Sequence, residues 1–117
     1  MGQPIVHFEI MGKDAARSQQ FYRELFSWDV GEAMGPEMGF YAMVDAASSG
    51  LATGIGSQPD GAVRTTVYVQ VPDLKATLDK AVSMGGKVLM EPTEIPGVVT
   101  LAMFADPDGN IIGLTKG

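Results

Sequence analysis

The sequence contains no cysteine, one histidine and one tryptophan among its 117 residues. Without cysteine the chain has no disulfide framework, no thiolate nucleophile and no zinc–thiolate site, and a cytoplasmic location is the expectation. Because His7 is the only histidine, one chain has no second imidazole to offer a metal ion. Catalysis of the Cys-His type is therefore excluded.

Basic residues are also few. Eight Lys and Arg stand against fourteen Asp and Glu, which gives a formal net charge of −6. A net negative charge repels phosphate backbones and anionic lipids, so we expect neither nucleic acid nor membrane as a partner. No apolar run approaches the roughly 18 residues of a spanning helix, and we expect no targeting signal at the N-terminus.

Apolar residues are plentiful by comparison. They make up 45% of the chain, and charged residues make up 19%. That balance is typical of a globular protein, and the length suits one hydrophobic core. The expected organisation is a single domain over residues 1–117.

The pattern of apolar residues predicts a repeat. Residues 5–11 alternate as a strand that carries His7 and Glu9 on one face, and a helix over residues 14–26 follows with Asp14 as its N-cap. Short strands are then expected at residues 28–33, 39–44 and 51–57, with a turn at 46–50.

The same order begins again at Arg64. Residues 64–71 alternate as a strand, and Asp73 caps a second helix that ends at Gly85 and Gly86. Strands are expected at residues 87–91, 98–105 and 110–116. An offset of 59 residues places His7 on Thr66 and Gly54 on Gly113. The sequence therefore predicts two tandem βαβββ halves, of about residues 1–60 and 61–117.

Three stretches carry a resemblance to a known family: IVHFEI (5–10), RSQQFYRELFSW (17–28) and FADPDGNIIGL (104–114). With them, the whole chain resembles the vicinal oxygen chelate superfamily, which comprises glyoxalases, extradiol dioxygenases and bleomycin-resistance proteins. The resemblance implies an α+β fold in which two tandem βαβββ modules form a curled eight-stranded mixed sheet around a cleft, with helices outside. It also implies that such relatives commonly form homodimers.

Metal-using members of that family take ligands from the first and last strands of each module. The corresponding residues here are His7, Gly54, Thr66 and Gly113. A divalent ion needs three or four donors, and glycine offers no side-chain donor. We therefore expect no metal and no other cofactor. A displaced pair of His7 and Glu9, about 6.5 Å apart along a strand, stays open as an alternative.

The residues expected to line the cleft share hydrogen-bonding or adaptable side chains: His7, Glu9, Thr66, Tyr68, Gln70 and Met103. For His7 the alternative is a hydrogen-bonded structural residue. Trp28 is expected to pack the end of the first helix onto the sheet. Asp106, Asp108 and Asn110 resemble the start of a calcium loop, but its distal Glu is absent, so a β-turn is predicted.

The sequence predicts a metal-independent protein that binds a small organic molecule and forms a homodimer. One alternative is a metalloenzyme with displaced ligands, either a glyoxalase-like lyase or isomerase or a dioxygenase-like oxygenase. Another is an interaction subunit whose cleft a partner fills. No residue set amounts to a catalytic signature, so catalytic residues stay unknown and enzymatic activity stays open.

Overall fold

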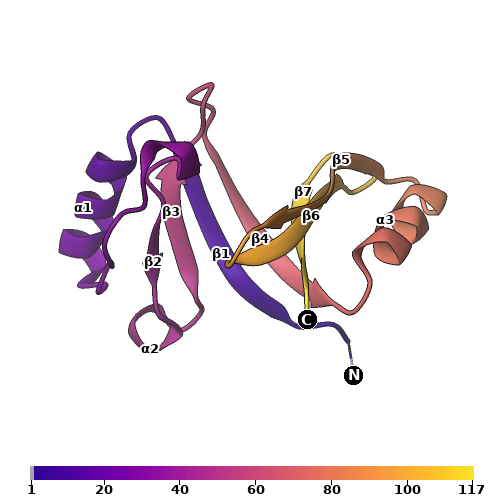
Figure 1. The fold of residues 1–117 in the computed structure, drawn as a ribbon, viewed down its shortest axis with the longest axis horizontal. Helices are drawn as coiled ribbons and strands as arrows, with labels where there is room; N and C mark the ends of the chain where they lie inside the picture. The colour runs from indigo at the N-terminus through magenta and orange to yellow at the C-terminus, as the bar shows by residue number, and fades with distance from the viewer. Residues whose placement is uncertain (1) are drawn as a thin grey trace. The chain divides into compact units, whose positions relative to one another are not determined.

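The computed structural model describes residues 2–117, and these form two compact units (Figure 1). The N-terminal unit comprises residues 7–65, and the C-terminal unit comprises residues 66–117 with the described residues before His7. Pro4 belongs to the C-terminal unit because its carbonyl oxygen accepts a 2.9 Å hydrogen bond from the Gln70 amide. The elements, in chain order, are β1 (Ile5–Gly12), α1 (Ala15–Phe26), η1 (Pro36–Met38), β2 (Ala42–Val44), α2 (Ala46–Ser49), β3 (Thr53–Ser57), β4 (Arg64–Val71), α3 (Leu74–Ser83), β5 (Lys87–Ile95), β6 (Val99–Ala105) and β7 (Ile111–Lys116).

In the N-terminal unit the strands lie in the order β2, β3, β1, and α1 packs against β3. β3 runs parallel to β1 and antiparallel to β2. The predicted N-cap is confirmed, because the Asp14 side chain accepts a 3.1 Å hydrogen bond from the Arg17 amide. The buried core beneath α1 consists of Val30, Ala42, Val44 and Ile55.

In the C-terminal unit the order is β4, β7, β6, β5, and α3 packs against the last three of these. β7 runs parallel to β4, whereas the β7–β6 and β6–β5 pairs are antiparallel. Asp73 caps α3 as predicted, with a 3.0 Å bond from the Ala76 amide. The buried core consists of Val71, Leu74, Leu78, Ala102 and Leu114.

The pairing registers of the two units repeat the 59-residue offset. In the N-terminal unit Glu9 lies opposite Gly54 on β1 and β3. In the C-terminal unit Tyr68 lies opposite Gly113 on β4 and β7. Both units are therefore built on the same parallel pair of first and last strands, which fixes the strand faces that carry the candidate site.

The expectation of eight strands is wrong, since residues 2–117 contain seven. The predicted strand at residues 28–33 is reduced to an isolated bridge between Val30 and Val44. Its backbone does reach β2 at one further point, where the Gly31 amide donates to Met43 O at 2.9 Å. A continuous ladder does not form because its partner, β2, has only three residues. In addition, Gly35 and Pro36 come shortly after the 28–33 segment and end its extended backbone.

Two other predictions need comment. The expected turn at residues 46–50 is the short helix α2, which ends at Gly50 with φ of 90°. The predicted cleft and the assignment of the whole chain to one domain stay predictions. No helix within residues 2–117 is long and apolar enough to cross a membrane.

Candidate functional site

His7 and Glu9 lie on the same face of β1, as the alternation predicts. Ile10, on the opposite face, packs against the core beneath α1. His7 is half-buried, and Glu9 is 8% exposed. The polar face of β1 is thus the side of the N-terminal sheet away from α1.

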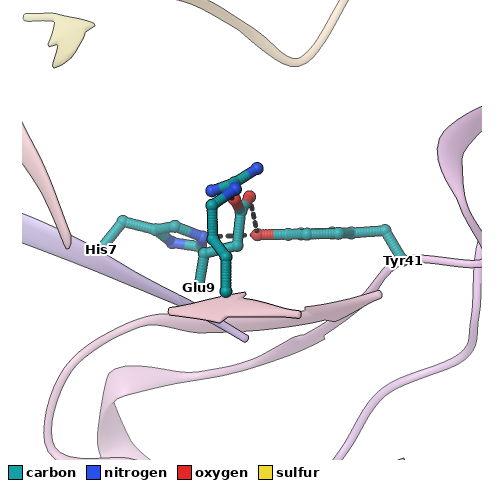
Figure 2. A network of polar contacts seen from close by, with 4 residues as sticks. His7, Glu9 and Tyr41 are labelled. Atoms are coloured by element: carbon teal, nitrogen blue, oxygen red, sulfur yellow. Dashed lines mark hydrogen bonds and ion pairs between the residues drawn. The ribbon is translucent and has the colours of Figure 1, made fainter. Parts of the chain in front are cut away.

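Tyr41 joins these two side chains (Figure 2). Its hydroxyl lies 2.7 Å from His7 Nε2 and donates a 3.0 Å hydrogen bond to Glu9 Oε2. A phenol has one proton, so with that proton given to Glu9 we assign to His7 the tautomer that donates from Nε2. The result is a chain of hydrogen bonds that runs from imidazole to phenol to carboxylate.

The other oxygen of Glu9 is held by Arg64. The guanidinium Nη1 lies 3.0 Å from Glu9 Oε1, and the two side chains are only 17% and 11% exposed. Charges this far removed from water require a partner. Arg64 therefore pairs with one oxygen of the Glu9 carboxylate, and the other oxygen orients the Tyr41 hydroxyl.

His7 is neutral at physiological pH in this setting. Burial lowers the pKa of His7 from its ordinary value of 6.5, and the negative charge of Glu9 opposes part of that shift. A neutral ring matches its role as a hydrogen-bond donor to a phenol. It is also compatible with the alternative that His7 is a hydrogen-bonded structural residue, since its ring is hydrogen-bonded to Tyr41.

Two glycines of β3 make room for Tyr41. A Cβ atom at Gly54 would overlap the phenol hydroxyl, and one at Gly56 would lie 2.8 Å from the ring edge. Both glycines are buried. Position 54, where the family resemblance places a metal ligand, is therefore covered by the Tyr41 side chain.

The C-terminal unit shows a similar arrangement. A Cβ atom at Gly113 would overlap the ring of Tyr68, its partner across β4 and β7. Tyr68 is buried at 3% exposure. The second glycine at a predicted ligand position is thus also covered by a tyrosine ring.

The loop before β2 sets the position of Tyr41. Gly39 and Phe40 both have positive φ, 64° and 52°, which is a rare conformation for phenylalanine. Gln19, buried on α1 at 6% exposure, donates 2.8 Å hydrogen bonds to Phe40 O and to Ile55 O. This one amide ties the loop to β3, the strand over which Tyr41 lies.

The remaining predicted residues lie in the C-terminal unit. Thr66, Tyr68 and Gln70 alternate along one face of β4, and Met103 pairs with Gly113 on the neighbouring strands. Thr66, Tyr68 and Met103 are buried, whereas Gln70 is half-buried. The structure brings His7 and Glu9 together, and it brings Tyr68 and Met103 together around Gly113. The sharing of one ligand by both sets stays a prediction.

Sequence reasoning missed Tyr41 and Arg64. A signal for Tyr41 was present in the alternating glycines of β3, because glycine inside a strand indicates the close approach of another group. Arg64 gave no comparable signal. By contrast, the structural role predicted for Trp28 is confirmed, since it packs against the core beneath α1.

Among residues 2–117 no group of three or more His, Cys, Asp or Glu side chains is placed to share a metal ion. The predicted β-turn after β6 is confirmed, with Asp106 accepting from the Asp108 and Asn110 amides at 2.9 Å. A shallow hollow of about 300 Å³ lies beside α3, lined by Met84, Phe104 and Pro107 among others, and it contains none of the predicted site residues.

Comparison with known proteins identifies the family. Residues 4–114 match the model of the Glyoxalase/Bleomycin resistance protein/Dioxygenase superfamily. The chain belongs to this superfamily. CFP32 of Mycobacterium tuberculosis, provisionally named a glyoxylase, is 44% identical over 50 residues, which are 43% of this chain and 19% of CFP32. DnrV of Streptomyces peucetius, named an anthracycline biosynthesis protein, is 28% identical over 117 residues, which are 87% of this chain and 42% of DnrV.

This chain thus spans less than half the length of either relative. Solved structures share its fold. Methylmalonyl-CoA epimerase from Mycobacterium tuberculosis superposes with a TM-score of 0.69 at 15% identity, over 96% of this chain and 86% of that one. A superfamily member from Vibrio splendidus 12B01 gives 0.66 at 14% identity, over 99% and 100%. At these identities the likeness concerns the fold alone.

Proposed function

We propose that this superfamily member binds a small organic molecule at the polar face of β1 and β3, without a divalent metal ion. The observation that carries the proposal is the engagement of His7 and Glu9 by a single phenol. Tyr41 bonds to both side chains at 2.7 and 3.0 Å. These are the two residues that a displaced metal site would need.

The surroundings of Glu9 disfavour a cation. One oxygen accepts from Tyr41 and the other is paired with the Arg64 guanidinium at 3.0 Å. A divalent ion at this carboxylate would have to displace the guanidinium or lie beside it, and like charges repel strongly away from water. Gly54 and Gly113 add no donor. His7 and Glu9 therefore supply only two of the imidazole or carboxylate ligands that such an ion commonly takes.

The same residues suit recognition of a flat polar molecule. The rings of His7 and Tyr41 lie nearly parallel, with 25° between their planes and 6.3 Å between centroids. Ligand sites commonly combine flat apolar surfaces with a few oriented hydrogen-bonding groups. DnrV is named for anthracycline biosynthesis, and an anthracycline is a planar, oxygenated molecule of this kind. That relationship supports the ligand class without naming the ligand.

The binding arm of the test uses the only imidazole in the chain as a reporter. We would titrate an anthracycline aglycone into the protein with chelator present and follow the ring proton signals of His7 by NMR. Saturable shifts are expected, and isothermal titration calorimetry, which needs no imidazole, should show binding by His7→Ala weakened about tenfold through a lost hydrogen bond. The control is Ser83→Ala, at an exposed position on α3. Unchanged affinity in His7→Ala would overturn the site.

The metal arm distinguishes the enzymatic alternative. Elemental analysis of the purified protein should find no stoichiometric divalent ion. Added zinc, nickel, manganese or iron should leave Tm nearly unchanged, because a metal ion stabilises the folded state only when it binds to it. One transition metal per chain, with His7 signals broadened by added manganese, would instead favour a metalloenzyme with displaced ligands.

A further inference from the structure

The outer face of α1 carries large apolar side chains that its own unit leaves exposed. Phe21 and Leu25 lie one helical turn apart on this face and are each 56% exposed. The helix buries Ala15 and Gln19 toward the sheet instead. In Figure 1 no other element of the N-terminal unit covers the side of α1 that faces away from β3. Apolar side chains grouped on an exposed helix face are a feature of interaction surfaces.

Phe21 on this face is connected to the core through aromatic contacts. Phe21 contacts Tyr22 edge-on at 5.1 Å, and Tyr22 stacks on Phe26 and on Trp28 at 6.0 and 5.6 Å. Trp28 in turn packs against the buried core. Aromatic side chains fixed in this way lose little conformational entropy when a partner covers them. They are therefore suitable anchors for an interface.

The charges on the outer face are self-complementary. Arg17, Phe21, Glu24 and Leu25 have the spacing of one helical face, and within residues 2–117 neither Arg17 nor Glu24 forms an ion pair. At 1.5 Å per residue, Arg17 lies about 6 Å before Phe21 and Glu24 about 4.5 Å after it. When two such helices cross antiparallel at Phe21, Arg17 of each lies opposite Glu24 of the partner subunit.

The overall charge favours the same face. The chain has a formal net charge of −6, so two copies repel one another in most orientations. α1 contains two arginines and one glutamate, which makes it net positive within an acidic protein. Two α1 helices that meet therefore bring less negative charge together than two acidic faces would.

We infer that the outer face of α1, formed by Arg17, Phe21, Glu24 and Leu25, binds a second copy of this chain through an antiparallel pairing of the two α1 helices. This inference is independent of the proposed ligand site, which lies on the other side of the sheet. It assigns a surface to the homodimer that the sequence only predicted. The pairing is isologous, so each apolar contact and each ion pair occurs twice.

Sedimentation velocity on the whole chain, from low to high micromolar concentration, tests the surface. The unmodified protein should form a dimer, and Phe21→Lys should raise the dissociation constant by about tenfold or more, because it places a charge in the apolar centre. The matched control is Val82→Lys, at a 49% exposed position on α3, which should dimerise normally. Circular dichroism establishes that both variants are folded.

Charge reversal tests the orientation of the helices. Arg17→Glu alone should weaken the dimer, and the double variant Arg17→Glu with Glu24→Arg should restore it, since the pairs are re-formed with opposite signs. A monomer at high micromolar concentration would overturn the inference. A dimer that neither Phe21→Lys nor Arg17→Glu weakens would place the interface elsewhere and would overturn it equally.

Discussion

The Tyr41 hydroxyl occupies the space into which a side chain at position 54 would project from β3. Any Cβ atom at Gly54 would overlap it. Tyr41 reaches this point from the loop before β2 and there bonds to His7 and Glu9. A family position that the resemblance assigns to a metal ligand is thus filled by a phenol from another part of the chain.

Gly54→Ala should destabilise the N-terminal unit. The added methyl group forces Tyr41 away from His7, and overpacking of a buried site costs about 1–3 kcal/mol in the free energy of unfolding. Urea denaturation measures this change. The matched control is Gly12→Ala on β1, where a Cβ atom meets nothing within 4 Å. Equal stability of the two variants would contradict the close contact.

Glu9→Gln should remove the partner of a largely buried guanidinium. Arg64 is then left with a neutral amide, and we expect a loss of about 2 kcal/mol in the free energy of unfolding. The pKa of His7 should fall further, because the charge of Glu9 raises it in the unmodified protein. NMR titration of the single histidine records that second effect.

The control for Glu9→Gln is Asp79→Asn. It breaks an ion pair with Lys75 whose side chains are 64% and 68% exposed. Water screens such a pair, so the free energy of unfolding should hardly change. A similar loss in both variants would show that the burial of the Glu9 pair adds nothing.

Stability should depend on pH through His7. Its folded pKa lies below the ordinary 6.5, so the unfolded chain binds a proton first as the pH falls. The part of the free energy of unfolding that depends on neutral His7 is therefore fully present above pH 6.5. It is lost as the pH falls from 6.5 through the folded pKa of His7. His7→Gln should flatten this part of the profile, measured by urea denaturation across mildly acidic pH. A His7 titration midpoint above 6.5 would refute the burial effect.

Gln19→Met should release the loop that carries Tyr41. The change keeps the volume but leaves Phe40 O and Ile55 O without their donor, at a cost of about 1–3 kcal/mol for a buried acceptor. The ring signals of His7 should move as well, because its phenol partner is displaced. Gln20→Met, one residue on at an exposed position, is the control and should leave those signals unchanged.

Local signals in the sequence predicted much of the fold. Asp14 and Asp73 marked the helix starts because a capping side chain acts on amides two or three residues away. The segment at residues 28–33 was mistaken for a strand because its pairing depends on β2, which is only three residues long. Strand formation is decided by partners that periodicity does not reveal.

The candidate site was predictable only in part. His7 and Glu9 followed from alternation along one strand. Tyr41 did not, because its position depends on positive φ at Gly39 and Phe40 and on a hydrogen bond from Gln19 on another element. Such a contact joins residues far apart in sequence, and no local pattern encodes it.

The paired registers of β1 with β3 and of β4 with β7 have a consequence for substitution at the two glycines. Gly54 and Gly113 correspond at the 59-residue offset, yet the tyrosine that covers each has a different origin: Tyr41 comes from a loop, and Tyr68 stands where the other half has Glu9. A side chain can stand at either glycine position only if the tyrosine above it is lost or moves. A single change of Gly54 or Gly113 to glutamate would therefore not place a carboxylate beside the first strand of its half.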